Sequence, residues 1–213
     1  SAKEADDLNH EAGGDQLIAR KVGSKLVASF TASKVRWMAD HEPDNASRVA
    51  SIALPHDWLS WQMQGGKDFD LLFTDRSDAS GTGYFNPVTS TYRHDILSSA
   101  LRTERAIIAP RIIEPAAFGG KTLSGIPIAA GAGDNAAAAL GVQAEPGDVV
   151  VSLGTSGTAF AISDTPTHDP SGAVAGFADA TGRYLPLVCT LNAARILDAA
   201  TRILGKSYEE VGQ

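Results

Sequence analysis

The sequence predicts a mixed α/β fold. Three observations support this class: the first half carries apolar residues at helical spacing, the second half carries short β-like runs bounded by glycines, and 43% of the 213 residues are hydrophobic. This apolar content is sufficient for one large domain or two small ones. The pattern changes near Ile107, where helical spacing gives way to strands that alternate with short helices.

Helices are predicted through most of the first half. A helix over residues 3–8 opens the sequence, and residues 30–38 carry apolar side chains at helical spacing. Pro43 ends this second helix, because proline disfavours helical backbone in the residue before it. Pro55 suits the first turn of a new helix, where its missing N–H is not needed. A further short helix is predicted over residues 92–101.

Strands and short helices alternate in the second half. Residues 134–141 are predicted to form a helix that ends at a glycine. Residues 148–153 and 158–162 are two β-like runs, and the small-residue turn between them is typical of a hairpin. The other predicted elements are two strands and an amphipathic helix, over residues 126–130, 184–190 and 192–204.

Composition excludes several classes of protein. The net charge is −7 and no basic stripe is present, which argues against a nucleic-acid partner. The longest apolar runs are near ten residues, far below the roughly 20 of a membrane-spanning helix. Cys189 is the single cysteine, so neither an intramolecular disulfide nor a cysteine zinc cluster can form. These features fit a cytoplasmic protein.

Asp134 is the strongest candidate for a catalytic side chain. It follows the turn Gly131-Ala132-Gly133, where a predicted strand ends and a helix begins. Such an aspartate can simply cap the helix. The glycines also clear side-chain bulk from around the carboxylate, which gives a ligand access to it. A carboxylate in this place can take a proton from an alcohol when the two groups are well positioned.

The turn after the next predicted strand is a candidate phosphate site. Backbone amides and hydroxyls that suit phosphate oxygens come from five consecutive residues: Gly154, Thr155, Ser156, Gly157 and Thr158. The segment is not a Walker loop, because no Gly-Lys-Ser/Thr follows, and an ordinary hairpin turn is the alternative. Paired with the carboxylate upstream, the turn indicates phosphoryl transfer from a nucleotide to a hydroxyl.

Residues 74–82 are dense in side chains that cap helices and build turns, and a loop is predicted there. Asp75 and Asp78 raise the question of a metal, but hydrogen bonds that build the turn explain them better. No metal ligand is therefore assigned. His56 and Asp57 are neighbours in sequence, and adjacent side chains on a helix rarely face each other, so structural roles are expected for both.

Five segments of the chain resemble the FGGY family of carbohydrate kinases, and within it the xylulokinases. They occur in family order and cover nearly the whole chain: residues 30–37, 54–59, 74–82, 131–135 and 152–158. The combination of Asp-Ala-Ser-Gly-Thr with Gly-Asp-Asn is quite specific. The Leu-Pro-His-Asp-Trp form at residues 54–58 is most similar to bacterial xylulokinases.

The resemblance implies an actin-like, ribonuclease H-like α/β fold of two domains with a cleft between them. Residues 1–122 would be the C-terminal part of the first domain, and residues 123–213 the N-terminal part of the second. Asp134 would deprotonate a sugar hydroxyl, Asp134 and Asn135 would hold the sugar, and the turn at 154–158 would line the nucleotide phosphates. ATP and Mg²⁺ follow as cofactors, and D-xylulose to D-xylulose 5-phosphate as the reaction.

The chain departs from the family by omission. The family's Asp-x-Gly-Thr-type phosphate loop, Met-His-Gly-type sugar contact and adenine-binding glycines do not occur in it, so we expect an internal fragment that is inactive alone. One alternative is another FGGY kinase, acting on a different ketose, a polyol or a sugar acid. A second is a nucleotide-binding actin-like module without turnover. The expected partner is a small-molecule sugar, and a homodimer stays open.

Overall fold

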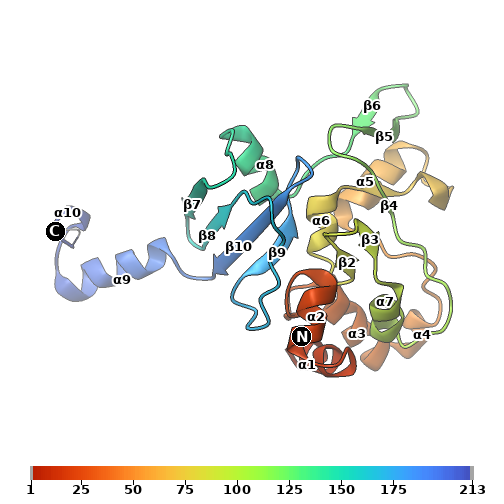
Figure 1. Ribbon diagram of the computed structural model, residues 1–213, viewed down its shortest axis with the longest axis horizontal. Coiled ribbons are helices and arrows are strands. Elements are labelled where there is room, and N and C mark those ends of the chain that lie inside the picture. Colours follow the sequence, from red (N-terminus) through yellow and green to blue (C-terminus); the bar gives the residue numbers. More distant parts are fainter. Residues whose placement is uncertain (1, 212–213) are drawn as a thin grey trace.

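The computed structural model describes residues 2–211, with helices concentrated in the first half of the chain and the largest sheet in the second (Figure 1). The helices are α1 (Ala2–Glu11), α2 (Asp15–Val22), α3 (Thr31–His41), α4 (Pro43–Ala46), α5 (Pro55–Met63), α6 (Arg76–Ser80), α7 (His94–Leu101), α8 (Asp134–Gly141), α9 (Ala194–Leu204) and α10 (Tyr208–Val211). No helix within residues 2–211 has the length and apolar character needed to cross a bilayer.

The strands are mostly short. They are β1 (Phe73–Thr74), β2 (Phe85–Asn86), β3 (Thr91–Tyr92), β4 (Arg111–Ile112), β5 (Phe118–Lys121), β6 (Pro127–Ala129), β7 (Val149–Leu153), β8 (Gly157–Ala161), β9 (Ala175–Ala178) and β10 (Tyr184–Thr190). A 3-10 turn, η1 (Phe69–Leu71), precedes β1.

Most of the first half packs around one large hydrophobic core. Helices α1, α2, α3 and α7 contribute buried side chains to it, among them Leu8, Ile18, Val35 and Leu97. The predicted helix boundaries are confirmed here, because α3 ends before Pro43 and α5 begins at Pro55. Proline therefore sets both boundaries, as its backbone chemistry requires.

The second half is built on an antiparallel sheet in the order β7-β8-β10-β9. Helix α8 lies against this sheet (Figure 1), and its buried Ala136 and Ala139 share a core with Phe160 of β8 and Leu185 of β10. Strands β7 and β8 form the predicted hairpin, in which Ser152 pairs with Thr158. The start of α8 and the tip of this hairpin therefore belong to one packed unit.

Helix α6 joins the two halves. The backbone amide of Ala178, in β9, donates a hydrogen bond of 2.9 Å to Ser80 Oγ of α6. Next to it, Phe177 packs against both hydrophobic cores. Figure 1 shows α6 between the helical half and the sheet. The segment of α6 is therefore buried at a junction rather than lying on the surface.

The predicted loop over residues 74–82 is wrong, because most of it is α6. Asp75 caps this helix by accepting hydrogen bonds from the amides of Ser77 (2.8 Å) and Asp78 (3.2 Å). The capping residues were thus the start signal of a short helix. The strand before it, β1, pairs in parallel with the distant β4.

The proposed boundary between residues 122 and 123 lies in the turn of the hairpin formed by β5 and β6. The fully buried residues of the first-half core extend to Ile107, and those of the sheet core begin at Ala136. The division into two domains at this turn stays a proposal.

Candidate functional site

The two motifs singled out in the sequence lie next to each other. Thr158 Oγ1, on β8, donates a hydrogen bond of 3.1 Å to Asn135 Oδ1, on α8. This bond spans 23 residues of sequence. It joins the helix that begins with Asp134 to the strand that follows the small-residue turn, so one local region holds both the candidate base and the candidate phosphate site.

Asp134 stands at the first residue of α8 with its side chain exposed. Its Oδ1 accepts hydrogen bonds from the backbone amide of Asn135 (2.7 Å) and from Asn135 Nδ2 (2.9 Å). Gly131, three residues earlier, has a φ of 81°, a conformation that side chains disfavour. Apart from its chain neighbours, no atom of residues 2–211 would lie within 4 Å of a Cβ there. The carboxylate is thus held through one oxygen beside an open turn.

Ser77 ties the loop before Asp134 to helix α6. Its Oγ accepts a hydrogen bond of 2.9 Å from the backbone amide of Gly133 and donates one to Asp75 Oδ2. Gly133 is also close to Asp78, since a Cβ on Gly133 would lie 3.1 Å from Asp78 Oδ1. The position of Asp134 therefore depends on α6, through a contact between residues 56 positions apart that no local sequence pattern predicts.

The candidate phosphate turn is open on its amide side. The carbonyl oxygens of Gly154 and Thr155 accept hydrogen bonds from the amides of Ala194 (2.9 Å) and Ala193 (3.1 Å), where α9 begins. Among residues 2–211, nothing accepts a hydrogen bond from the amides of Thr155 and Ser156. Both of these residues are exposed. The turn is thus anchored through its carbonyls and presents free donors to solvent.

The two glycines of this turn differ in the space around them. A Cβ at Gly154 would meet only the Ser156 carbonyl oxygen, at 3.4 Å. A Cβ at Gly157 would lie 2.9 Å from the Cβ of Ala193. Gly154 therefore leaves room above the turn, whereas Gly157 is needed for packing against the start of α9.

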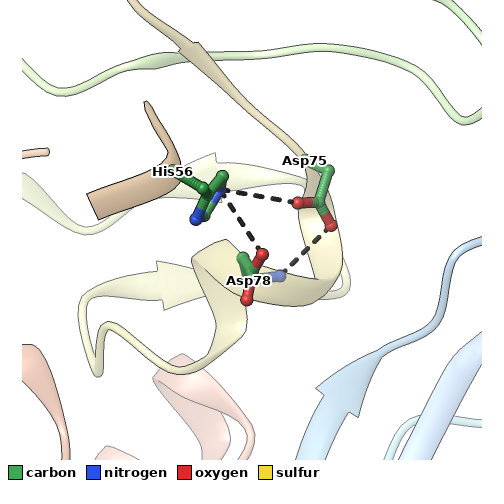
Figure 2. A group of neighbouring side chains, drawn as sticks. All are labelled: His56, Asp75 and Asp78. Carbon is green, nitrogen blue, oxygen red and sulfur yellow. Dashed lines mark hydrogen bonds and ion pairs between the residues drawn. The ribbon is translucent and has the colours of Figure 1, made fainter. Parts of the chain in front are cut away.

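A group of titratable side chains lies where α5, the end of β1 and α6 meet. Figure 2 shows His56 facing Asp75 and Asp78, with Nε2 at 3.9 Å from Asp75 Oδ1 and 3.4 Å from Asp78 Oδ2. The same nitrogen is 2.8 Å from Asp57 Oδ1 and 3.3 Å from Thr74 Oγ1. Three carboxylates thus surround one imidazole.

This crowding shifts the ionisation of the group. Burial, together with the negative charge of Asp75, raises the pKa of Asp78 to about 6. The contact with Asp57 is the main cause that raises the pKa of His56, and burial opposes it. Compared with isolated side chains, Asp78 and His56 therefore each keep a proton to a higher pH, because each bound proton lowers the excess of negative charge.

The expectation that His56 and Asp57 do not face each other is wrong. Asp57 lies in the first turn of α5, where its Oδ2 turns back to accept a hydrogen bond of 2.8 Å from the amide of Leu54. This capping geometry brings Oδ1 beside the neighbouring imidazole. Two features of the sequence could have indicated this group of side chains: the aspartate at the third helical position after Leu54, and the acidic segment 75–78.

Comparisons with known proteins bear on the whole chain. Residues 1–141 match the model of the FGGY family of carbohydrate kinases, N-terminal domain. The xylulose kinase of Streptomyces coelicolor is 43% identical over 99% of this chain and 44% of its own length. The xylulose kinase of Streptomyces rubiginosus is 41% identical over the same shares.

A solved structure shows the same fold. The crystal structure of xylulose kinase from Bifidobacterium adolescentis matches with a TM-score of 0.84 and 45% sequence identity, over 93% of this chain and 45% of that one. The predicted α/β fold of the sugar kinases is confirmed by this match. The chain spans less than half the length of the relatives it matches.

Proposed function

Because the chain belongs to the FGGY family of carbohydrate kinases, we propose that it is part of an enzyme that transfers a phosphoryl group from ATP to a sugar hydroxyl. The acceptor proposed is D-xylulose and the product D-xylulose 5-phosphate. This choice is supported by relatives named as xylulose kinases that align with almost the whole chain. A cytoplasmic location and a small-molecule sugar as the partner belong to the same proposal, with a homodimer left open.

Asp134 is proposed as the general base. Its Oδ1 is engaged by Asn135, so the carboxylate is oriented while its other oxygen stays available to a sugar hydroxyl. A general base needs such hydrogen-bond access to the proton that it removes. The Asn135 side chain, held by Thr158, would place a second polar group beside the same sugar.

The turn at residues 154–158 is proposed to hold the nucleotide phosphates. The free amides of Thr155 and Ser156 and the open space at Gly154 fit phosphate oxygens, which backbone donors bind without bulky side chains. When bound, ATP with Mg²⁺ supplies the phosphoryl group and offsets its negative charge. The Mg²⁺ is assigned to the nucleotide phosphates, and no side chain of this chain is assigned to it.

The hydrogen bond between Thr158 and Asn135 is the single observation that carries this proposal. It puts the candidate base and the candidate phosphate turn on neighbouring elements of one packed unit. Phosphoryl transfer depends mainly on positioning and electrostatics, so this proximity is what the reaction requires.

The test is an ADP-release assay of the complete enzyme over a panel of ketoses, polyols and sugar acids. The proposal expects D-xylulose to give the highest kcat/KM. A polyol or a sugar acid as the best substrate would keep the kinase assignment but replace the acceptor. Nucleotide binding without turnover on any acceptor would favour the non-catalytic module instead.

A further inference from the structure

The carboxylate group around His56 contains a buried oxygen without a hydrogen bond. Asp75 is 5% exposed, and its Oδ2 is fully used by the amides of Ser77 and Asp78 and by the Ser77 hydroxyl. Its Oδ1 has no hydrogen-bond partner among residues 2–211 and faces His56 Nε2 (Figure 2). A buried carboxylate oxygen left in this state is costly unless a cation satisfies it.

The charges of the group do not balance without a further cation. The carboxylates of Asp57, Asp75 and Asp78 all lie within 4 Å of one imidazole nitrogen. Even a fully charged imidazolium offsets only one negative charge, and the carboxylates of Asp57 and Asp75 already supply two. Asp57 and Asp75 are almost fully buried, so water screens them poorly.

The ligand atoms lie close enough together for one divalent cation to contact all three after small movements. His56 Nε2, an Asp75 oxygen and an Asp78 oxygen all lie within 4.8 Å of one another. A cation that holds nitrogen and oxygen ligands at about 2.0–2.2 Å separates neighbouring ligands by roughly 3–3.5 Å. The separations of 3.4 and 3.9 Å from Nε2 require only small side-chain movements to reach this geometry.

We propose that His56, Asp75 and Asp78 form a binding site for a divalent transition-metal cation of the Mn²⁺ or Zn²⁺ type. One imidazole nitrogen with two carboxylates favours these ions over Ca²⁺, which takes oxygen ligands. The cation would take the place of the proton that His56 Nε2 shares with Asp57 Oδ1 at 2.8 Å; this proton leaves to solvent, and Asp57 then adds negative charge beside the cation. The partly exposed side chains of His56 and Asp78 leave an entry path and positions for water.

The site would tie α5 to α6, because His56 lies in α5, Asp75 caps α6 and Asp78 lies within α6 (Figure 2). Asp78 Oδ1 is also close to Gly133, directly before Asp134. This cation would be held by protein side chains rather than by nucleotide phosphates, and the inference goes beyond the proposed function, since binding here needs neither sugar nor ATP.

The test is titration of the metal-free protein with MnCl₂ alone, and in parallel with ZnCl₂ alone, with no nucleotide present. Binding is followed by calorimetry and by electron spin-echo spectroscopy of Mn²⁺, which detects a coordinated imidazole nitrogen. We expect one cation per chain, a nitrogen coupling, and a rise in Tm on addition of metal.

Two substitutions remove ligands with little change of shape: His56→Gln and Asp78→Asn. Each should weaken binding by at least about 10- to 100-fold, and His56→Gln should also abolish the nitrogen coupling. The matched controls are His10→Gln and Asp70→Asn, two exposed residues away from the group, which should bind metal like the unchanged protein.

Three outcomes would overturn the site. The unchanged protein could fail to bind either cation at millimolar concentration, which would leave His56 as a counter-ion of the carboxylates. It could bind without a nitrogen coupling, or the two variants could bind as tightly as the controls. If a variant does not fold, the coupling in the unchanged protein decides the question. None of these results depends on kinase activity, so a failure here leaves the proposed function standing.

Discussion

Asp134 is held through one carboxylate oxygen by its neighbour Asn135, and the loop before it is held by Ser77. Replacing Asp134 by alanine removes the proposed base and leaves this anchoring of Gly133 in place. In the complete enzyme we expect Asp134→Ala to lower kcat by about 10²-fold or more, with a smaller change in the KM for the sugar. Steady-state kinetics with D-xylulose measures both constants.

The matched control for this substitution is Asp164→Ala, because Asp164 is an exposed carboxylate that pairs with Arg183 outside the site. It should leave kcat unchanged. A turnover close to normal in Asp134→Ala would remove the base assignment.

Gly154 offers a clean test of the phosphate turn, because among residues 2–211 a Cβ there would make only one ordinary contact, at 3.4 Å from the Ser156 carbonyl oxygen. Gly154→Val should place its methyl groups over the free amides of Thr155 and Ser156 and block the approach of phosphate. We expect the KM for ATP to rise about tenfold, as the loss of roughly 1.4 kcal/mol of hydrogen bonding would give. The thermal stability should change little.

The control is Gly141→Val, at the last residue of α8 and outside the turn, where a Cβ would contact no described residue beyond its own helix. An unchanged KM for ATP in Gly154→Val would show that the phosphates bind elsewhere. Gly157→Val is a poorer test, since its side chain would collide with Ala193 and disturb α9 whatever the turn binds.

At the residue scale, the sequence identified the candidate side chains of the site but not the tertiary contacts between them. Asp134, Asn135 and the turn at 154–158 were all identified from local chemistry. The bond from Asn135 to Thr158 and the bond from Gly133 to Ser77 depend on tertiary packing across 23 and 56 residues. The group around His56 was missed for the same reason, because α5 and α6 meet only in the folded chain.

At the element scale, the predicted boundaries were good wherever a local residue sets them. Proline begins α5, and the predicted helix over residues 134–141 coincides with α8. The failures lie where pairing is distant or the element is short. Strand β9 and the parallel pair of β1 with β4 carry no local signal, and α6 has only five residues.

Helices α1, α3 and α7 are joined by one charged side chain. Arg36 of α3 is 1% exposed, pairs with Glu11 of α1, and donates to the carbonyl of Ser99 in α7. Partial burial alone would raise the pKa of the Glu11 carboxyl, but hydrogen bonds from Ser99 and Arg36 hold that pKa below its ordinary value. The ionised form of Glu11 therefore stabilises the fold.

We expect Glu11→Gln to lower the free energy of unfolding by about 1 kcal/mol near pH 7. The effect is smaller than for a fully buried ion pair, because Glu11 is partly exposed and water screens its charge. A carboxyl with a lowered folded pKa contributes stability above its unfolded pKa and loses it as the pH falls through the folded pKa. The difference between the two proteins should thus shrink below about pH 4.5.

Urea unfolding at a series of pH values measures this difference, and Glu104→Gln is the control, since Glu104 is an exposed residue of the loop after α7. If the difference in unfolding free energy between Glu11→Gln and the unchanged protein stays constant from pH 7 to acid pH, the Glu11 carboxylate contributes no charge-dependent stability.

At the scale of the whole molecule, apolar surface is concentrated in the second half. Strand β7 is at one edge of the sheet, and its Val149, Val151 and Leu153 are exposed, Leu153 to 71%. Helix α9 extends away from the sheet in Figure 1 and exposes Ile203 and Leu204. An edge strand with unpaired backbone groups and an apolar surface favours pairing with another chain.

We therefore expect the 213-residue chain on its own to self-associate and to show no sugar kinase activity. In-line transfer needs the nucleophile, the γ-phosphate and Mg²⁺ aligned in a closed site. Residues 2–211 offer one candidate base and one candidate phosphate turn, and the chain covers 44% of the length of its Streptomyces coelicolor relative. Light scattering should give a mass above 22.2 kDa, and a coupled ADP assay with D-xylulose should give no signal.

A charge on the edge strand should weaken this association, because it opposes strand pairing. Val151→Lys should shift the mass toward that of the monomer, whereas Val88→Lys, at an exposed valine of the loop between β2 and β3, should not. A monodisperse monomer that turns over D-xylulose would contradict both expectations. It would mean that the exposed faces of β7 and α9 need no covering and that these residues alone assemble a working site.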